Sequence, residues 1–314
     1  MSPTSLPRRW RQSLGRLRRL WRNRHFLDAL LLDGQAHFLR FAPPGHFYSP
    51  IPQAGLELDE HGYATLAGVD LNLAGQLDTI AALAAYYAEL PFPEHPADGH
   101  RFHFDNPYFT GGDAVVLYGM LRRLEPRRIV EVGSGHSSAA MLDVTDRFAL
   151  SPRITFIEPY PATLHACLRD TDLERHTLVT SKVQAVGMGV FEALAAGDIL
   201  FIDSSHVLKA ASDVHFLLFD VLPRLAPGVV VHLHDIPWPF EYPQVWLREG
   251  RAWNEGYALR AFLQYNDTFE IVCFNAYLAC LERERLAACM PRMLVPPRHA
   301  TTLGNSSLWL RKRA

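Results

Sequence analysis

RIVEVGSGHSS, residues 128–138, is the stretch that decides the fold of this chain. A run of apolar residues passes directly into a turn that contains Gly133 and Gly135, and then into a serine-rich segment. Glycines let the backbone turn sharply and let a ligand approach without interference from a Cβ atom. The first amides of a following helix have no partner inside that helix. The stretch therefore predicts a strand, a tight loop and a helix, with or without a ligand at the loop.

Short apolar strands alternate with helices outward from this stretch, from about residue 111 onward. The expected helices cover residues 114–124, 137–150, 162–170, 208–225 and 257–265. The expected strands cover residues 128–132, 154–158, 183–186, 199–203, 229–233, 269–274 and 307–311. Continuous apolar strands separated by helices are typical of a parallel sheet that is covered on both faces. The pattern predicts an α/β, doubly wound, Rossmann-like domain over residues 111–314.

The region before this domain has a different character. Residues 26–110 are rich in loops, with one expected helix at about 75–90, and we expect them to form an N-terminal cover. Residues 1–25 form a basic leader in which Trp10, Leu14, Leu17 and Trp21 recur at helical spacing among arginines. The leader is either a helix that contacts an anionic membrane surface or a solvated, disordered segment.

Composition excludes several classes of protein. The net charge of the 314 residues is −2, and the chain after the arginine-rich leader is strongly acidic, which disfavours binding to nucleic acid. No apolar run is long enough for a membrane-spanning helix, and the start of the chain lacks the features of a signal peptide. The four cysteines form no CxxC pair, so free thiols and a cytoplasmic protein are expected, with the leader as a possible membrane contact.

An acidic residue ends the second expected strand. A carboxylate at the position of Glu158 can accept hydrogen bonds from both ribose hydroxyls of an adenosine, or it can be a solvated strand-end acid. Together with the glycine loop it predicts a nucleoside site. The pattern does not separate S-adenosylmethionine from NAD, although a dinucleotide site would place a third glycine near Ser138. The residues expected at this site are Glu131, Gly133, Ser134, Gly135, Ser137 and Glu158.

A second group of polar residues ends the next two neighbouring strands. Asp203 follows the fourth strand, and His234 and Asp235 follow the fifth. Carboxyl ends of adjacent parallel strands face one crevice, so these three side chains are expected to meet. Two carboxylates and an imidazole suit a divalent ion, with Mg²⁺ favoured and Mn²⁺, Fe²⁺ or Zn²⁺ also compatible. The alternative is that Asp203 caps a helix and that His234 and Asp235 begin a polar loop.

The run GDAVVLYGMLRRLEPRRIVEVGSGHSSAAML, residues 112–142, resembles class I methyltransferases of the catechol O-methyltransferase type. The resemblance continues through FIEP at 156–159, ILFIDSSH at 199–206 and PGVVVHLHDI at 227–236. It implies a seven-stranded sheet whose last strand is antiparallel, and S-adenosyl-L-methionine as the cofactor. It also implies that Asp203 lies beside the cofactor. Asp113 is expected on the cofactor side or as a helix-capping residue.

The Asp-Ser-Ser-His run at 203–206 is similar to one in metal-dependent macrolide sugar O-methyltransferases and in the cephalosporin hydroxylase group. The resemblance implies that His206, expected at the start of a helix, is the general base. An imidazole with an ordinary pKa of about 6.5 can accept a proton from a hydroxyl near neutral pH. His234 stands where those relatives carry an acidic residue.

The sequence therefore predicts a metal-assisted O-methyltransferase that acts on a hydroxyl of a small molecule or glycan. The alternatives are a metal-dependent hydroxylase or oxidoreductase on the same fold, a nicotinamide-dependent oxidoreductase and a non-catalytic nucleoside-binding module. Aromatic loops at 46–48, 106–109 and 238–242 either stack on an acceptor or pack beneath the cover, and residues 253–255 are further candidates for the same crevice. The oligomeric state is not predicted.

Overall fold

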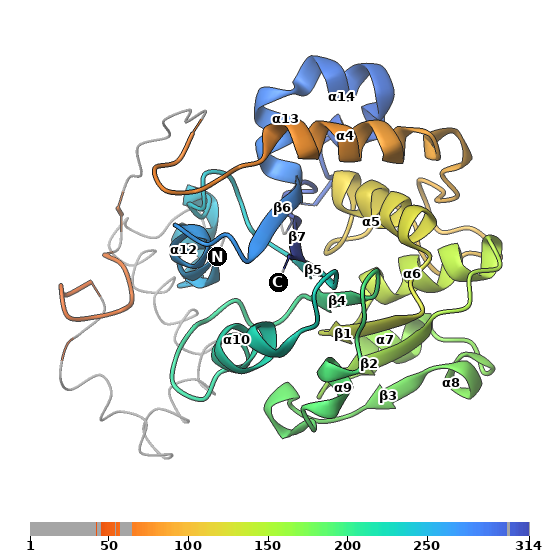
Figure 1. Ribbon diagram of the computed structural model, residues 1–314, viewed down its shortest axis with the longest axis horizontal. Helices are drawn as coiled ribbons and strands as arrows, with labels where there is room; N and C mark the ends of the chain where they lie inside the picture. The colour runs from red at the N-terminus through yellow and green to blue at the C-terminus, as the bar shows by residue number, and fades with distance from the viewer. Residues whose placement is uncertain (1–41, 43–44, 54, 57–64, 300–301, 314) are drawn as a thin grey trace, which may run out of the picture. The chain divides into compact units, whose positions relative to one another are not determined.

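The computed structural model describes residues 42, 45–53, 55–56, 65–299 and 302–313 (Figure 1). Two compact units are present: residues 1–59 with 248–252, and residues 60–247 with 253–314. In the smaller unit the described part of 45–53 is a turn in which the amide of Gly45 donates to the carbonyl of Ile51 at 3.0 Å. Residues 65–110 belong to the larger unit, which also contains the sheet. The leader predicted over residues 1–25 lies outside the described residues.

The larger unit is built on one seven-stranded sheet with the order β3-β2-β1-β4-β5-β7-β6. Strands β1 to β5 pair in parallel, and β7 pairs antiparallel with both β5 and β6. This arrangement confirms the predicted doubly wound α/β fold and its antiparallel last strand. The strands are β1 (Arg128–Val132), β2 (Arg153–Ile157), β3 (Thr177–Val179), β4 (Ile199–Ile202), β5 (Val230–Leu233), β6 (Phe269–Phe274) and β7 (Leu308–Lys312).

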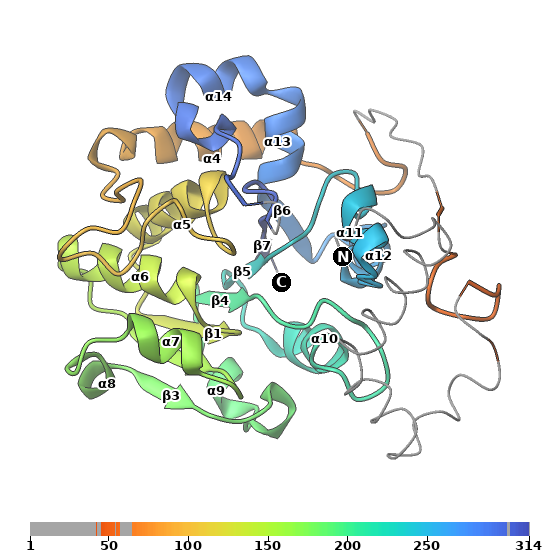
Figure 2. The same cartoon turned by 180° about the vertical axis from the view of Figure 1, so that it is seen from behind.

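Helices cover both faces of the sheet. Helices α5, α6 and α7 lie side by side on the face seen in Figure 2, and α4 packs near β6. Because crossovers between parallel strands are right-handed, the direction change at β1 sends α10 and α12 to the opposite face. The helices are α4 (Leu73–Ala84), α5 (Gly111–Leu124), α6 (His136–Arg147), α7 (Ala162–Cys167), α8 (Asp172–Arg175), α9 (Gly189–Glu192), α10 (Asp213–Phe216), α11 (Gln244–Glu249), α12 (Glu255–Leu263), α13 (Asn275–Leu281) and α14 (Arg283–Cys289).

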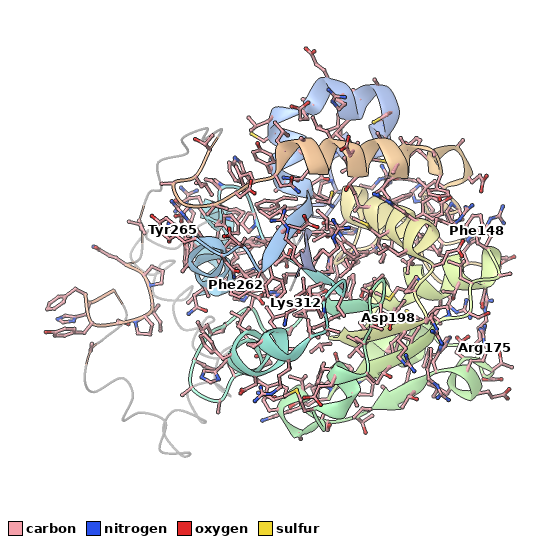
Figure 3. The ribbon with its side chains drawn as sticks, in the orientation of Figure 1. Phe148, Arg175, Asp198, Phe262, Tyr265 and Lys312 are labelled. Atoms are coloured by element: carbon pink, nitrogen blue, oxygen red, sulfur yellow. The ribbon has the colours of Figure 1, made fainter. Side chains whose placement is uncertain are left out.

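Strands β4 and β5 are buried along their whole length, which is why their sequences are almost entirely apolar. Every residue of β4 and β5 is buried. Asp198, which precedes β4, accepts hydrogen bonds from the amides of Arg127 and Arg128 at 3.0 and 2.8 Å. Lys312, at the end of β7, donates to the carbonyl of Pro223 at 2.7 Å (Figure 3). These contacts fix the amino-terminal edge of the parallel strands, which leaves the carboxyl edge for the site.

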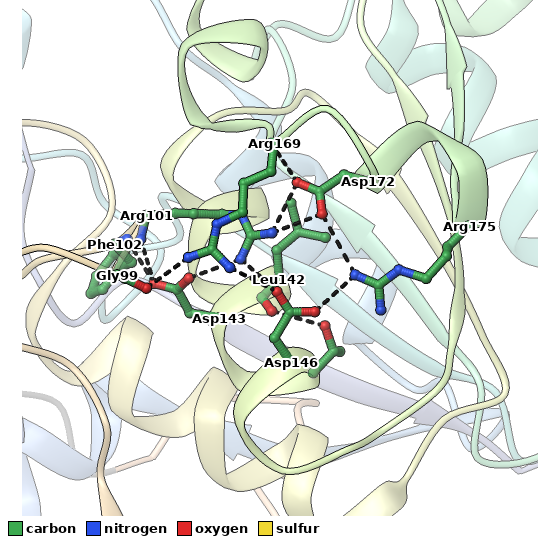
Figure 4. A network of polar contacts seen from close by, with 10 residues as sticks. Gly99, Arg101, Phe102, Leu142, Asp143, Asp146, Arg169, Asp172 and Arg175 are labelled. Atoms are coloured by element: carbon green, nitrogen blue, oxygen red, sulfur yellow. Dashed lines mark hydrogen bonds and ion pairs between the residues drawn. The ribbon is translucent and has the colours of Figure 1, made fainter.

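A buried ionic network joins the segment before α5 to helices α6 and α8. The guanidinium of Arg101, whose side chain is 3% exposed, contacts Asp143 at 3.1 Å, Asp146 at 2.8 Å and Asp172 at 2.7 Å (Figure 4). Arg175 adds a second contact to Asp146 at 2.8 Å. Three carboxylates around one guanidinium satisfy most of its donors, so this segment is held firmly against the sheet domain.

Several predicted elements were wrong in place or length. Residues 183–185 form a 3₁₀ turn, and the third strand is β3, which is short and partly exposed and therefore lacks an apolar run. The helix predicted at 208–225 begins only at Asp213, because the Ser212 hydroxyl accepts from the amide of His215 at 3.1 Å and caps it there. It continues as a π turn over Leu217–Val221 and a 3₁₀ turn over Leu222–Arg224. Helices α13 and α14 occupy a stretch in which the sequence pattern predicts no element.

Asp113 lies in the first turn of α5 and is fully buried. Its carboxylate accepts from the amides of Ser306 and Ser307 at 2.9 and 2.8 Å, and from the side-chain amide of Asn275 at 2.9 Å. The residue therefore joins the start of α5 to the segment that leads into β7. Of its two predicted locations, the structure places it at the helix start, engaged by these three donors.

Candidate active site at the carboxyl edge of the sheet

The glycine loop after β1 comes very close to the end of β4. Gly133 has φ of +82°, and a Cβ at this position would lie 1.7 Å from the carbonyl oxygen of Asp203. Its amide donates to the carbonyl of Ile157 at 3.0 Å. Only glycine combines this positive φ with so close a backbone contact. The loop thus joins the ends of three strands, β2, β1 and β4, at the point where the order of the sheet changes direction.

Glu131 organises this loop from below. It is fully buried, and its carboxylate accepts from the hydroxyls of Ser137 at 2.7 Å and Ser138 at 2.5 Å. Burial raises the pKa of Glu131 to about 7, although the serine hydrogen bonds oppose this shift. The amide of Gly135 in turn donates to the Ser138 hydroxyl at 2.9 Å. The predicted loop residues Glu131, Gly135 and Ser137 are brought together, but Glu131 lies beneath the loop.

Glu158 lies beside the glycine loop, as the sequence predicts. Its Oε2 accepts from the amide of Ser134 at 3.1 Å, and its Oε1 accepts from the amide of Tyr160 at 2.7 Å. Two backbone amides therefore orient the carboxylate at the mouth of the loop. Since a carboxylate oxygen has two lone pairs, each oxygen keeps a free acceptor position for a ligand hydroxyl.

A cavity of about 440 Å³ opens at this edge of the sheet. Its volume falls in the range of sites for nucleoside-sized ligands. It is lined by residues that follow β1, β2 and β4 and by the turn around residue 183: Val132, Gly133, Ile157, Glu158, Pro159, Tyr160, Lys182, Val183, Gln184, Asp203, Ser204, Ser205, Lys209, Ala211, Ser212 and Asp213. The volume of this cavity and the oriented Glu158 carboxylate on its wall fit an adenosine cofactor.

The predicted base and two of the predicted metal ligands meet next to this cavity. Nε2 of His206 lies 3.5 Å from Oδ1 of Asp203 and 3.9 Å from Oδ2 of Asp235. Asp203 also lines the cavity. The strand ends of β4 and β5 thus bring an imidazole and two carboxylates to one place, beside the nucleoside-sized space.

His206 does not begin a helix, contrary to the prediction. It has φ of +59°, in the left-handed region, and α10 begins seven residues later at Asp213. Its carbonyl accepts from the amides of Asn254 and Glu255 at 3.1 and 3.2 Å, so it satisfies donors at the start of α12. A non-glycine residue in this region is strained, and such strain persists only where surrounding contacts impose it.

Glu255 contacts the same imidazole from the other side. Its Oε2 lies 3.0 Å from Nδ1 of His206, and the two residues are 2% and 5% exposed. The Trp253 ring packs against the imidazole with the ring centroids 4.4 Å apart. The sequence analysis names residues 253–255 only as candidates for the crevice. The available signal is an acid just before the helix predicted at 257–265, which says nothing about a contact with a residue 49 positions earlier.

The charges of this cluster shift its pKa values in opposite directions. Burial alone would lower the pKa of His206, but its hydrogen bonds to Asp203 and Glu255 and the nearby charge of Asp235 outweigh burial and raise the pKa well above its ordinary value. Burial would raise the pKa of Asp203, but the neighbouring His234 and His206 lower it. Burial raises the pKa of Asp235. An imidazolium beside at least one carboxylate is the favoured state of this cluster.

His234 lies deeper than the other two predicted metal ligands. Its imidazole is buried against Phe109, with the ring centroids 5.1 Å apart, and its Nε2 is 3.7 Å from Oδ1 of Asp235. Neither ring nitrogen has a hydrogen-bond partner among the described residues. Over the same residues, no group of three or more His, Cys, Asp or Glu side chains is close enough to hold a metal ion. The donor types suit a cation, and the unpartnered imidazole is compatible with one, but no ready-made cage is present there.

The aromatic loops have different roles. Phe240 and Tyr242 are buried, so the 238–242 loop packs into the fold. Phe109 is also buried, against His234, whereas Tyr108 is 62% exposed and is available to a ligand. The loop at 46–48 belongs to the smaller unit, where Phe47 is 81% exposed.

In the part of the chain that the structure describes, no helix has the length and apolar character needed to cross a membrane.

Comparisons with known proteins identify a methyltransferase domain in this chain. A family model described as a methyltransferase domain matches residues 130–236, which contain the glycine loop, Glu158, Asp203, His206 and Asp235. A protein of Archaeoglobus fulgidus, described only as uncharacterized, is 33% identical over 164 residues, which is 48% of this chain and 73% of that protein.

Solved structures of methyltransferases are similar at low identity. The Mg- and SAM-bound form of CmcI is 19% identical with a TM-score of 0.39, covering 73% of this chain and 84% of that one. The O-methyltransferase TomG of Streptomyces achromogenes, in complex with SAM, is 12% identical with a TM-score of 0.42, covering 76% and 90%. The family assignment rests on the matched methyltransferase-domain model and on the strand order of the sheet. The chain belongs to the class I S-adenosylmethionine-dependent methyltransferases.

Proposed function

We propose that this methyltransferase transfers the methyl group to a hydroxyl oxygen of a small molecule or glycan. The observation that carries the proposal is the position of Asp203. This residue lines the nucleoside-sized cavity and lies 3.5 Å from Nε2 of His206, so one strand end joins the cofactor space to a proton acceptor. A hydroxyl acceptor needs such a neighbour, because an alkoxide is a far better nucleophile than an alcohol.

The roles of the residues follow from their positions. S-adenosylmethionine, when bound, supplies an electrophilic methyl group on a sulfonium sulfur. Glu158 would accept from the ribose hydroxyls, and the backbone at Gly133, which lines the cavity, would contact the nucleoside. An acceptor hydroxyl at the cavity edge would give its proton to Nε2 of His206 while its oxygen forms the new bond to the methyl carbon. The bond from that carbon to sulfur would break, with its electron pair staying on sulfur, so that S-adenosylhomocysteine leaves.

The raised pKa of His206 has a consequence for this role. An imidazolium cannot accept a proton, so the residue must first lose its own proton to solvent. The same raised pKa makes the neutral imidazole a stronger base once it forms. Asp203 and Asp235 would then stabilise the imidazolium that is produced by proton transfer.

We extend the proposal to a divalent cation, with Mg²⁺ as the first candidate. Asp203, Asp235 and His234 would hold it, and it would lower the pKa of an acceptor hydroxyl. The support is the chemistry of these donors and the buried His234 ring, both of whose nitrogens lack a partner among the described residues.

The test is a calorimetric titration of the purified protein with S-adenosylmethionine, S-adenosylhomocysteine and NAD, with and without a chelator. We expect both sulfur nucleosides to bind, NAD not to bind, and Glu158→Ala to weaken binding at least tenfold. The matched control is Glu284→Ala, in the exposed first turn of α14. Methyl transfer from labelled cofactor to a panel of phenols, catechols and methyl glycosides then tests the acceptor class. Transfer to nitrogen or carbon acceptors alone would contradict the hydroxyl proposal, and transfer unchanged by chelator would contradict the cation.

A further inference from the structure

The Glu255 carboxylate is the closest charged group to the His206 ring. Its Oε2 is 3.0 Å from Nδ1, whereas the carboxylates on the Nε2 side lie at 3.5 and 3.9 Å. An ionised carboxylate can only accept hydrogen bonds, so Nδ1 must be the donor in this contact. Because the contact at Nδ1 is the shorter one, the geometry assigns the donor role to Nδ1–H and leaves Nε2 turned toward Asp203 and Asp235.

The start of α12 holds the backbone of His206 as well as its ring. The amide of Glu255 donates to the His206 carbonyl, and the side chain of Asn254 bonds to Leu208 twice, at 2.6 Å from the Leu208 amide and 3.1 Å to its carbonyl. Trp253 covers the ring. Together these contacts impose the left-handed backbone at His206 and fix both the position and the rotation of its imidazole.

We propose that Glu255 is a positioning residue: it holds His206 by Nδ1–H and leaves Nε2 as the atom that faces Asp203, Asp235 and the acceptor. A histidine that accepts a proton through one ring nitrogen needs a partner that fixes the other, since otherwise both tautomers and several ring rotations compete. This inference rests on the proposed function only for the identity of the proton that Nε2 takes. The orientation itself is a property of the protein alone.

The experiment is nuclear magnetic resonance of protein labelled with ¹⁵N in histidine, with His206→Gln to assign the signals. Two-bond ¹H–¹⁵N spectra at the alkaline end of the stable range show which nitrogen keeps the proton. In the wild type we expect the neutral His206 ring to carry its proton on Nδ1, with a far-downfield Hδ1 signal. A neutral ring with its proton on Nε2 would overturn the proposal, and so would a ring that stays doubly protonated throughout.

Two variants separate positioning from a merely structural role. In Glu255→Gln the amide can donate as well as accept, so we expect a mixture of tautomers with little change in Tm. In Glu284→Gln, which removes the same charge from the first turn of α14, we expect the wild-type spectrum. An unchanged tautomer in Glu255→Gln and in Glu255→Leu would contradict the proposal.

Turnover supplies the second readout, with an acceptor that the wild type methylates. Glu255→Gln is expected to lower kcat by about 10- to 100-fold, the usual effect of removing an orienting partner, while KM for S-adenosylmethionine changes less than threefold. An active wild type with an equally active Glu255→Gln contradicts the positioning role. If the wild type binds no sulfur nucleoside, the proposed function is contradicted. The tautomer of His206 still tests the positioning role of Glu255 in that case.

Discussion

At the scale of single residues, the form of the candidate site depends more on backbone conformation than on side-chain chemistry. Gly133 is required because the loop and the end of β4 meet backbone to backbone, and His206 adopts a left-handed conformation that its neighbours impose. Both residues stand where the sequence indicates a site. Their conformations follow from contacts with Asp203 and with residues 254–255, which a local pattern does not report.

Gly133→Ala is predicted to damage both stability and cofactor binding. The methyl group would meet the Asp203 carbonyl, and a non-glycine residue at φ of +82° is strained, so we expect a loss of at least about 2 kcal/mol. Urea unfolding measures the loss, and calorimetry measures binding of S-adenosylhomocysteine. Gly187→Ala is the control, because no atom lies within 4 Å of a Cβ there. Equal stability of the two variants would show that the loop is not as close to β4 as described.

His206→Ala is predicted to keep the affinity for S-adenosylhomocysteine within threefold of the wild type and to lower kcat by about 10²- to 10⁴-fold, the range for loss of a general base. The residue borders the cavity through Asp203 but is not among its lining residues. Single-turnover transfer from labelled cofactor measures the effect. If turnover survives unchanged, His206 is not the base.

At the scale of elements, the sequence predicts strands far better than it predicts short helices. The runs at 128–132, 199–202 and 269–274 are recovered because the sheet is covered on both faces and each strand is mostly apolar. β3 is missed because an edge strand of three partly exposed residues has no such run. Helix α10 is misplaced because the Ser212 cap, rather than periodicity, fixes its start.

The residues of the candidate site, like the elements, can be predicted from the sequence only in part. The glycine loop, Glu158, Asp203 and Asp235 are predictable, since the carboxyl ends of neighbouring parallel strands must meet. Glu255 is not, because its approach to His206 depends on how helix α12 is placed against the loop after β4. His234 is placed at the correct strand end, but its burial against Phe109 depends on the segment before α5.

The network around Arg101 gives an element-scale prediction for acid stability. Burial would raise the pKa of Asp146, but hydrogen bonds from Arg175 and Arg101 outweigh it and hold the pKa below its ordinary value. A lowered folded-state pKa stabilises the protein above the unfolded-state value of about 3.9, and the contribution is lost as pH falls through the folded-state value. Asp146→Asn should therefore destabilise the protein at pH 7, by at most about 1 kcal/mol because solvent screens this exposed carboxylate, and flatten the fall in stability below about pH 4.

Urea unfolding between pH 7 and pH 3 measures this dependence. The exposed Asp170→Asn, two residues before Asp172 in the sequence, is the control and should follow the wild-type curve. A variant at Asp146 whose stability falls with pH as steeply as the wild type would show that the network does not hold this carboxyl ionised.

At the scale of the whole molecule, the sheet is completed by residues that are distant in sequence. Asp113 at the start of α5 binds the segment before β7 through the amides of Ser306 and Ser307. Asp235 at the candidate site accepts from the Ser306 hydroxyl at 3.1 Å. The site at the end of β5 is thus supported by chain that lies about 70 residues further on.

Asp113→Ala is predicted to destabilise the protein by roughly 2–5 kcal/mol, because it leaves two buried amides and the Asn275 side chain without their acceptor. Chemical unfolding measures the change, and hydrogen exchange of the Leu308–Lys312 amides locates it. The exposed Asp98→Ala serves as the control. A loss below about 0.5 kcal/mol would falsify the view that Asp113 joins the two segments.

The place of β7 between β5 and β6 also affects the order in which the sheet can form during synthesis. Among the described strands β6 pairs only with β7, so residues 269–274 are synthesised before the strand that must receive them. The edge of the sheet at β6 can therefore form only after residues 308–312 have been added, although the five parallel strands are already present in the chain.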